Sequence, residues 1–162
     1  MKELQIFTTG GTIDKVYFDQ KSDYEIGDAT IGNLLESMNV SFDYYVEELM
    51  KIDSLDMTES HRRVIYDKVL ESLFEHVLIT HGTDGMIETA KTLNTIDNKI
   101  IVLTGSLQPM AFAKNDAVFN IGCSIAAIQS LPKGVYIVMS GRVFNPDNVV
   151  KNYIDGKFEC ID

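Results

Sequence analysis

Hydroxyl, glycine and carboxylate residues occur together at several places in this 162-residue sequence. The segments are residues 8–12 (TTGGT), 53–56 (DSLD), 80–85 (THGTDG), 104–106 (TGS) and 140–142 (SGR). Glycine lets a ligand approach the backbone closely, and amides, hydroxyls and carboxylates can hold a small anionic or zwitterionic molecule. These residue types therefore indicate a site for a small polar molecule, provided that the fold brings the segments together.

The segment Gly10-Gly11-Thr12 has two interpretations. It could present backbone amides to a ligand, or it could be a tight turn that leaves a strand. It is not a Walker loop, because no Gly-Lys-Ser/Thr follows. It is not a dinucleotide fingerprint either, because the third glycine is missing and the polar residues Asp14 and Lys15 follow.

The other candidate side chains also have structural alternatives. Thr83 and Asp84 could cap a helix, or they could hold an anionic or zwitterionic ligand at the positive end of that helix. His81 could be a base, although a histidine at a strand end is more often structural. Helix capping, a solvated surface charge or loop decoration would account for the remaining candidates: Ser54, Asp56, Lys151, Tyr17 and Tyr24.

The chain has a formal net charge of −10, from 14 basic and 24 acidic residues. This balance argues against binding to a nucleic-acid backbone and against an anionic membrane surface. Cys123 and Cys160 have no metal-ligand spacing and fit a reducing compartment. The N-terminal residues contain no apolar run of signal-peptide length, so we expect a soluble cytoplasmic protein.

The elements that would position the candidate residues alternate between strands and helices. Apolar runs or alternating apolar residues predict strands at residues 4–9, 42–46, 76–80, 100–103 and 135–139. Helical spacing predicts three buried faces, namely Ile65, Val69 and Leu73, then Met86, Ala90 and Leu93, and finally Val118, Gly122, Ile125 and Ile128. Thr58 or Asp56 is available to cap the first of these helices.

This alternation predicts an α/β fold, a three-layer, doubly wound, mainly parallel sheet with helices on both faces. Ligands of such sheets bind beyond the carboxyl ends of the strands. Each polar segment follows one of the predicted strands, so we expect all of them to lie along one edge of the sheet.

Taken together, the segments resemble the bacterial-type L-asparaginase family. Residues 9–13 (TGGTI) are similar to the family's first signature, and residues 81–90 (HGTDGMIETA) to its more specific second signature. Residues 104–109 (TGSLQP) follow at the family's approximate spacing. The resemblance covers essentially all of residues 1–162. It implies a single domain of the family's N-terminal kind, without the C-terminal domain that follows in full-length members.

The resemblance implies that Thr12 is the attacking hydroxyl. Tyr24 resembles the mobile-loop tyrosine that hydrogen-bonds to this threonine, and it fits better than Tyr17 does. A carboxamide is a poor electrophile, and covalent attack by a hydroxyl divides its hydrolysis into two easier steps. A tyrosine, or a lysine whose pKa is lowered by burial, can assist the proton transfer, and amides at glycine turns can stabilise the oxyanion.

Four further roles follow from the resemblance. Ser54 resembles the serine that holds the substrate α-carboxylate. Thr83 and Asp84 resemble the second threonine and the acid that binds the α-amino group, and Lys151 resembles the lysine that completes a Thr-Lys-Asp triad. The implied substrate-binding residues are Gly11, Ser54, Gly82, Thr83 and Asp84. The chemistry requires no metal and no organic cofactor.

The implied activity is hydrolysis of L-asparagine to L-aspartate and ammonia through an acyl-enzyme, with glutamine and other ω-amides as alternative substrates. Leu55 stands where many family members carry a glutamine that contacts the substrate. A homodimer is expected, because the family's active sites lie at subunit contacts. Two alternatives stay open, a non-catalytic domain that binds or senses an amino acid, and a chain that needs a partner polypeptide to complete its site.

Overall fold

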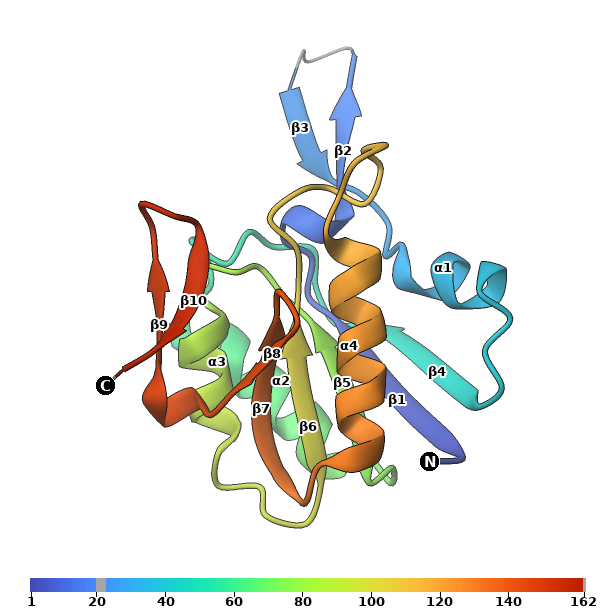
Figure 1. The fold of residues 1–162 in the computed structure, drawn as a ribbon, viewed down its shortest axis with the longest axis vertical. Helices are drawn as coiled ribbons and strands as arrows, with labels where there is room; N and C mark the ends of the chain where they lie inside the picture. The colour runs from blue at the N-terminus through green and yellow to red at the C-terminus, as the bar shows by residue number, and fades with distance from the viewer. Residues whose placement is uncertain (20–22, 162) are drawn as a thin grey trace.

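A six-stranded sheet with helices on both faces forms the centre of the molecule (Figure 1). The computed structural model describes residues 1–19 and 23–161. The strands follow the order β4 (Asp43–Glu48), β1 (Glu3–Thr8), β5 (His76–Thr80), β6 (Ile100–Thr104), β7 (Gly134–Met139) and β8 (Arg142–Phe144). The first five strands are parallel, and β8 is antiparallel to β7. The predicted α/β fold with a mainly parallel sheet is confirmed.

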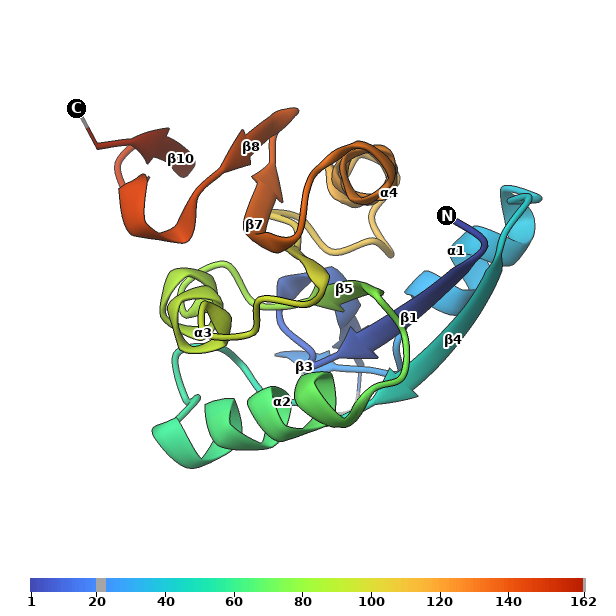
Figure 2. The same cartoon turned by 90° about the horizontal axis from the view of Figure 1, so that it is seen from below.

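The helices form two layers, one on each face of the sheet (Figure 2). These are α1 (Ile31–Ser37) and α4 (Ala117–Ser130) on one face, and α2 (Glu59–Glu71) and α3 (Met86–Leu93) on the other. Leu78 of β5 packs with the first layer, whereas its neighbour Ile79 packs with the second. Because successive side chains point to opposite faces, a strand covered on both faces must be apolar at every position.

Two of the predicted helical faces were partly wrong. Leu73 lies beyond the end of α2 and is 98% exposed. In α4 the predicted Val118 and Gly122 are exposed, and the buried stripe contains the polar residue Asn120 instead. Thr58, one of the two predicted caps, is the N-cap residue of α2.

Hydrogen bonds explain why α4 buries Asn120 against the sheet. The Asn120 side-chain amide nitrogen donates to the backbone oxygen of Gly105 at 3.0 Å, and its side-chain oxygen accepts from the Ser140 amide at 2.9 Å. A buried polar group is tolerated when its hydrogen bonds are satisfied. The helix is therefore rotated relative to the face that its apolar residues alone predict.

Three hairpins complete the part of the chain that the structure describes. They are β2 (Lys15–Phe18) with β3 (Asp23–Ile26), β7 with β8, and β9 (Val149–Asn152) with β10 (Lys157–Cys160). Short 3-10 helices precede two of them, η1 (Thr12–Asp14) and η2 (Pro146–Asn148). The polar segment around Ser140 and Gly141 forms the tight turn from β7 into β8, with positive φ angles of 52° and 78° at these two residues.

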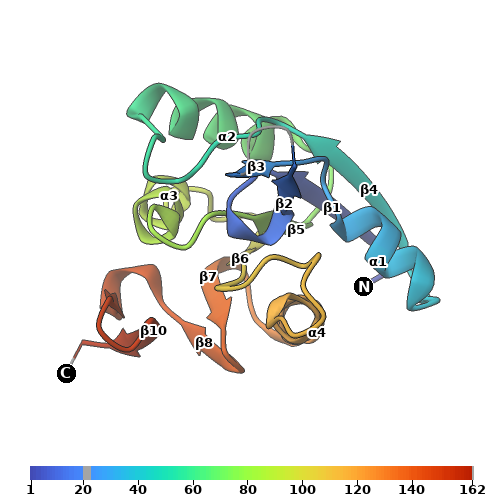
Figure 3. The same ribbon diagram turned by 90° about the horizontal axis from the view of Figure 1, so that it is seen from above.

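The carboxyl ends of the parallel strands meet at the upper edge of the molecule in Figure 1. Viewed from this edge, the turn after β1 lies between the layer of α2 and α3 and the layer of α1 and α4 (Figure 3). Most of the polar segments therefore converge where the sequence predicts. Within residues 1–19 and 23–161, no helix has both the length and the apolar character needed to cross a membrane.

Candidate active site

Glycines allow the loops at the carboxyl edge of the sheet to touch one another. Gly11 has a φ of +89°, and a β-carbon at this position would lie 2.6 Å from both Cα and N of Gly82. Gly82 in turn packs against the Ser54 side chain, and Gly105 packs against the His81 carbonyl oxygen. Four loops that are distant in the sequence therefore meet at distances that no larger residue permits.

Lys151 joins two of the predicted site residues. Its Nζ donates to Thr83 Oγ1 at 2.8 Å and to Asp84 Oδ1 at 2.6 Å. The Lys151 side chain is only 10% exposed, so the interpretation as a solvated surface charge is wrong. The three predicted residues of the Thr-Lys-Asp group thus lie together, although 67 residues separate Asp84 from Lys151.

Capping does not account for Thr83 and Asp84. Helix α3 begins at Met86, its N-cap residue is Gly85, and no side chain forms a cap hydrogen bond there. The only side-chain hydrogen bonds of Thr83 and Asp84 within the described residues are those with Lys151. Both residues are therefore oriented by the lysine, and the second carboxylate oxygen of Asp84 is left available for a ligand.

Ser54 supplies an unsatisfied hydroxyl beside this group. Its side chain is buried, and its Oγ has no hydrogen-bond partner within residues 1–19 and 23–161. A buried hydroxyl without a partner is unusual, and here it lies against Gly82 in the site. The Ser54 hydroxyl therefore keeps an unused hydrogen-bonding capacity next to the Gly82 loop.

The residues on either side of Ser54 shape the rim of the site. Asp53 accepts hydrogen bonds from Lys15 Nζ at 2.9 Å and from the Leu55 amide at 3.2 Å. Burial pushes the Asp53 pKa upward, but these hydrogen bonds outweigh it and leave the pKa below its ordinary value. The Leu55 side chain is exposed, so it offers an apolar surface at the rim.

Thr12 lies at the start of η1, next to the contact between Gly11 and Gly82. Its hydroxyl makes no hydrogen bond with any residue in the described ranges. The loop is anchored by Asp14, whose carboxylate accepts from the Thr30 amide at 2.9 Å and from the Thr30 hydroxyl at 2.8 Å. Burial raises the pKa of this carboxyl above its ordinary value.

The structure does not bring Tyr24 to Thr12. Tyr24 lies on the β2–β3 hairpin, which projects from the edge of the sheet (Figure 1). Its exposed ring packs against Tyr17 and Phe112, with centroid distances of 5.4 Å and 5.8 Å. Across the described part of the chain, no hydrogen bond joins its hydroxyl to Thr12. Tyr17 is exposed on the same hairpin.

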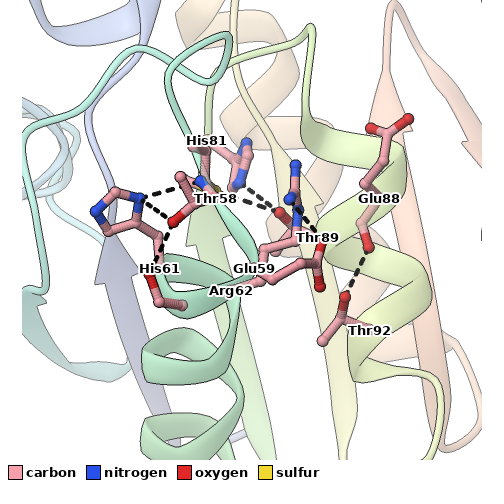
Figure 4. A network of polar contacts seen from close by, with 10 residues as sticks. Thr58, Glu59, His61, Arg62, His81, Glu88, Thr89 and Thr92 are labelled. Carbon is pink, nitrogen blue, oxygen red and sulfur yellow. Dashed lines mark hydrogen bonds and ion pairs between the residues drawn. The ribbon is translucent and has the colours of Figure 1, made fainter.

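His81 has a structural role. Its ring is completely buried, and Nδ1 donates to the Gly82 carbonyl oxygen at 2.7 Å. Nε2 accepts from Thr89 Oγ1 at 2.8 Å (Figure 4). Burial lowers the pKa of His81 to about 4, so the ring is neutral at physiological pH. Both nitrogens are occupied, and the ring holds the Gly82 loop in place rather than acting as a base.

One buried charge near the site escaped the sequence analysis. Arg62 of α2 is buried next to Gly85, and its Nη1 donates to Glu59 Oε1 at 2.9 Å (Figure 4). Position 62 precedes Ile65 by three residues and therefore belongs to the same predicted helical face. That spacing was the available signal, but a charged residue is rarely buried and was not assigned to the core.

Neither the site nor the rest of the described residues contains a group of three or more His, Cys, Asp or Glu side chains that could hold a metal ion. The side chains that do converge are hydroxyls, one carboxylate and one lysine. Such groups can bind a small zwitterionic molecule and place a hydroxyl next to it.

Comparison with known proteins agrees with this geometry. The model of the family "Asparaginase, N-terminal" matches residues 3–156. A subunit of the glutamyl-tRNA(Gln) amidotransferase of Aeropyrum pernix is 31% identical over 156 residues, which cover 87% of this chain and 35% of the relative. L-asparaginase 2 of Escherichia coli is 28% identical over 165 residues, covering 93% of this chain and 47% of the relative.

The solved structures agree with the sequence relatives. The crystal structure of a probable cytoplasmic L-asparaginase from Campylobacter jejuni superposes with a TM-score of 0.80 and 27% identity, over 99% of this chain and 52% of that one. The chain thus spans about half the length of these relatives, or less. It belongs to the asparaginase family and corresponds to the family's N-terminal domain.

Proposed function

We propose that this chain is an amidohydrolase that converts L-asparagine to L-aspartate and ammonia, with Thr12 as its nucleophile. The observation that carries the proposal is the Lys151 group. Nζ holds Thr83 and Asp84 at 2.8 Å and 2.6 Å, beside the contact between Gly11 and Gly82 that brings the Thr12 loop to them.

The substrate would be held at both ends of its amino-acid moiety. The Ser54 hydroxyl, which has no partner among the residues the structure describes, donates to the α-carboxylate. The Asp84 oxygen not used by Lys151 accepts from the α-ammonium group. Asparagine is the proposed substrate. A pocket distinguishes one methylene by only about 1–3 kcal/mol, so glutamine is the closest competitor.

In the first step, Thr12 Oγ attacks the carboxamide carbon. The Thr12 proton passes by way of the Tyr24 hydroxyl to the amide nitrogen, the carbon–nitrogen bond breaks, and ammonia leaves. Backbone amides at the Gly11–Thr12 turn stabilise the oxyanion. Since Tyr24 packs on Phe112 and makes no hydrogen bond to Thr12 within residues 1–19 and 23–161, this step requires the hairpin to move toward Thr12.

In the second step, water hydrolyses the acyl-enzyme. Because Thr83 Oγ1 accepts from Lys151, the hydrogen of the Thr83 hydroxyl is free to bond to that water. The bond between the acyl carbon and Thr12 Oγ breaks, aspartate leaves, and a proton returns to Thr12. Lys151 thus keeps Thr83 and Asp84 in their working positions during both steps.

We also propose that the protein works in the cytoplasm as a homodimer. The name of the Campylobacter jejuni relative supports the location. The Aeropyrum pernix relative is named as one subunit of an amidotransferase, which favours a second candidate, a chain that needs a partner polypeptide to complete the site.

Ammonia release from L-asparagine by the purified chain tests the proposal, with Thr12→Ala as the critical variant. Thr95→Ala is the matched control, because Thr95 is exposed and its hydroxyl donates to Tyr66 outside the site. Loss of turnover in Thr12→Ala alone, with asparagine binding retained in calorimetry, supports the nucleophile. Equal turnover in Thr12→Ala and the wild type overturns it.

If the wild type binds aspartate but releases no ammonia, the chain is a binding domain or lacks a partner. Titration of the inactive chain with a relative's separately produced second half then separates these two alternatives. Ammonia release on mixing identifies the partner-dependent enzyme, and continued inactivity identifies the binding domain.

A further inference from the structure

Arg62 is a buried cation that the proposed reaction does not use. Its side chain is 10% exposed, and its Nε has no hydrogen-bond partner within residues 1–19 and 23–161. The one ion pair of Arg62 in these ranges is with Glu59, at 2.9 Å. The Glu59 side chain is 85% exposed, so water screens its charge and it balances the buried guanidinium only in part. A guanidinium stays protonated when it is buried, so the positive charge persists.

The guanidinium lies next to the loops of the candidate site. A β-carbon built on Gly85 would lie 3.6 Å from Arg62 Nη2 and 3.2 Å from Ser54 Cβ, so both side chains border the same point. In Figure 4 the Arg62 side chain reaches from α2 toward His81 and Thr89. Burial is the main cause of the lowered pKa of His81, and the positive charge of Arg62 adds to it. The electrostatic field of Arg62 therefore acts on the loop of residues 81–85.

Two other cations at the site are already paired with carboxylates. Lys15 Nζ lies 2.9 Å from Asp53 Oδ2, and Lys151 Nζ lies 2.6 Å from Asp84 Oδ1. In the proposed binding mode, Asp84 also receives the α-ammonium group of the substrate. Of the three cations, Arg62 has the most exposed counter-charge, so its positive charge is the least balanced.

The α-carboxylate of the substrate needs a positive charge near it. The Ser54 hydroxyl is the only group assigned to this carboxylate in the proposed binding mode, and it is neutral. Moving a carboxylate from water into a partly buried site is costly unless a positive charge compensates for the lost hydration. A buried cation is little screened by salt, so its attraction extends beyond direct contact.

We propose that Arg62 is a positioning residue whose charge attracts the α-carboxylate of the substrate to the Ser54 hydroxyl. The inference rests on the proposed function, because it concerns one end of the same substrate. It favours α-amino acids with a free α-carboxylate. An asparagine inside a peptide carries no charge at this position, so Arg62 would give it no advantage.

Calorimetric binding of L-asparagine tests this role in the Thr12→Ala chain, which serves as the parent so that the ligand is not consumed. Arg62→Met and Arg63→Met are a matched pair of neighbours on α2, and either substitution changes the net charge from −10 to −11. The Arg63 side chain is 69% exposed and pairs with Asp67. We expect Arg62→Met to weaken binding about fivefold, because a buried charge is lost, and Arg63→Met to leave binding unchanged.

Two further variants separate the charge of Arg62 from its packing. Arg62→Lys keeps the charge, so it should bind asparagine within about twofold of the parent. Glu59→Gln removes the carboxylate that partly offsets the guanidinium, so it should tighten binding by about twofold. If the ion pair were only structural, Glu59→Gln and Arg62→Met would both weaken binding. The thermal midpoint of each variant checks that it is folded during the titration.

Equal binding in Arg62→Met and the parent overturns this inference and leaves the proposed function standing. A loss that Arg62→Lys does not recover, or that Glu59→Gln shares, also overturns it. If the parent binds no asparagine and the wild type binds no aspartate, the proposed function fails together with the inference.

Discussion

The two sides of the candidate site differ in how well hydrogen bonds hold their side chains in place. On one side, Lys151 is nearly buried and holds Thr83 and Asp84 by short hydrogen bonds, and His81 fixes the adjoining Gly82 loop. On the other side, the Thr12 hydroxyl has no partner within the described residues, and Tyr24 is exposed on a hairpin.

Because of this difference, we expect one side of the site to bind the substrate and the other side to carry out the reaction. Groups held by the sheet and by buried hydrogen bonds are in place before a ligand arrives, so binding costs them little conformational entropy. In the described part of the chain, β2 and β3 pair with each other and with no strand of the six-stranded sheet, and Tyr24 packs on Phe112. We therefore expect the Lys151 side to define the substrate position and the hairpin side to control when Thr12 reacts.

The largest effect is expected from Lys151→Met, which removes the hydrogen-bond donor that holds Thr83 and Asp84 in place. Removing Nζ frees Thr83 and leaves Asp84 without its cation. Turnover should fall by about 1,000-fold, within the range of lost proton-transfer and positioning groups. Ammonia release measures this, with Lys157→Met on β10 of the same hairpin as the control. Turnover at the wild-type rate in Lys151→Met would show that the hydrogen bonds of Lys151 to Thr83 and Asp84 are only structural.

Tyr24→Phe tests the hairpin side and should lower turnover by about 100-fold. The ring contacts with Tyr17 and Phe112 survive this change, so the thermal midpoint should stay the same. Asparagine binding, measured by calorimetry, should also be retained. The control is Tyr17→Phe, and equal losses in the two variants would contradict the assignment of Tyr24.

Gly11→Ala tests whether close contact between loops holds the two sides together. The new β-carbon would clash with the Gly82 backbone at 2.6 Å and strain a residue with φ of +89°. We expect the free energy of unfolding to fall by about 2 kcal/mol. Chemical denaturation measures this loss. Gly32→Ala is the control, because the nearest atom to its β-carbon is a side-chain carbon 3.8 Å away.

The smallest expected effect is the pH dependence that comes from His81. Its pKa of about 4 in the folded chain is below the ordinary 6.5, so the unfolded chain binds more protons between these values. Stability should therefore fall as the pH decreases from 6.5 towards 4. Between pH 7.5 and 5.5 the loss assigned to His81 is about 1.4 kcal/mol.

Denaturation of the wild type and His81→Gln at both pH values isolates this contribution. The difference between the two proteins should become smaller in acid, because the variant lacks the imidazole. A constant difference would mean that the ring is not held neutral. The hairpin variant Tyr24→Phe should show the same pH dependence as the wild type.

Elements buried on both faces were the most predictable part of the fold. Strands β5 and β6 are continuous apolar runs, because both of their faces are covered, and such runs are visible in a sequence. The short hairpins and α1 were not predicted. They are short and only a few of their residues are buried, so burial leaves no strong pattern in the sequence.

Polar contacts inside the core were less predictable. The stripe that α4 buries depends on Asn120, whose partners Gly105 and Ser140 come from other loops. Similarly, Arg62 is buried beside Gly85 through packing between α2 and the loop before α3. A residue's own position in a helix does not reveal such partners, because they are supplied by segments far away in the chain.

The amino-acid sequence alone determined the α/β class, the edge of the sheet where the polar segments gather, and the residues suited to the chemistry. The class and the edge follow from local apolar periodicity and residue types, and the residues suited to the chemistry follow from the resemblance to the asparaginase family. Only the tertiary structure decided that Lys151 reaches across 67 residues to Asp84, that Ser54 Oγ has no partner among the described residues, and that Tyr24 stands apart from Thr12. Those outcomes depend on how the hairpins and loops pack, and packing is a property of the whole chain.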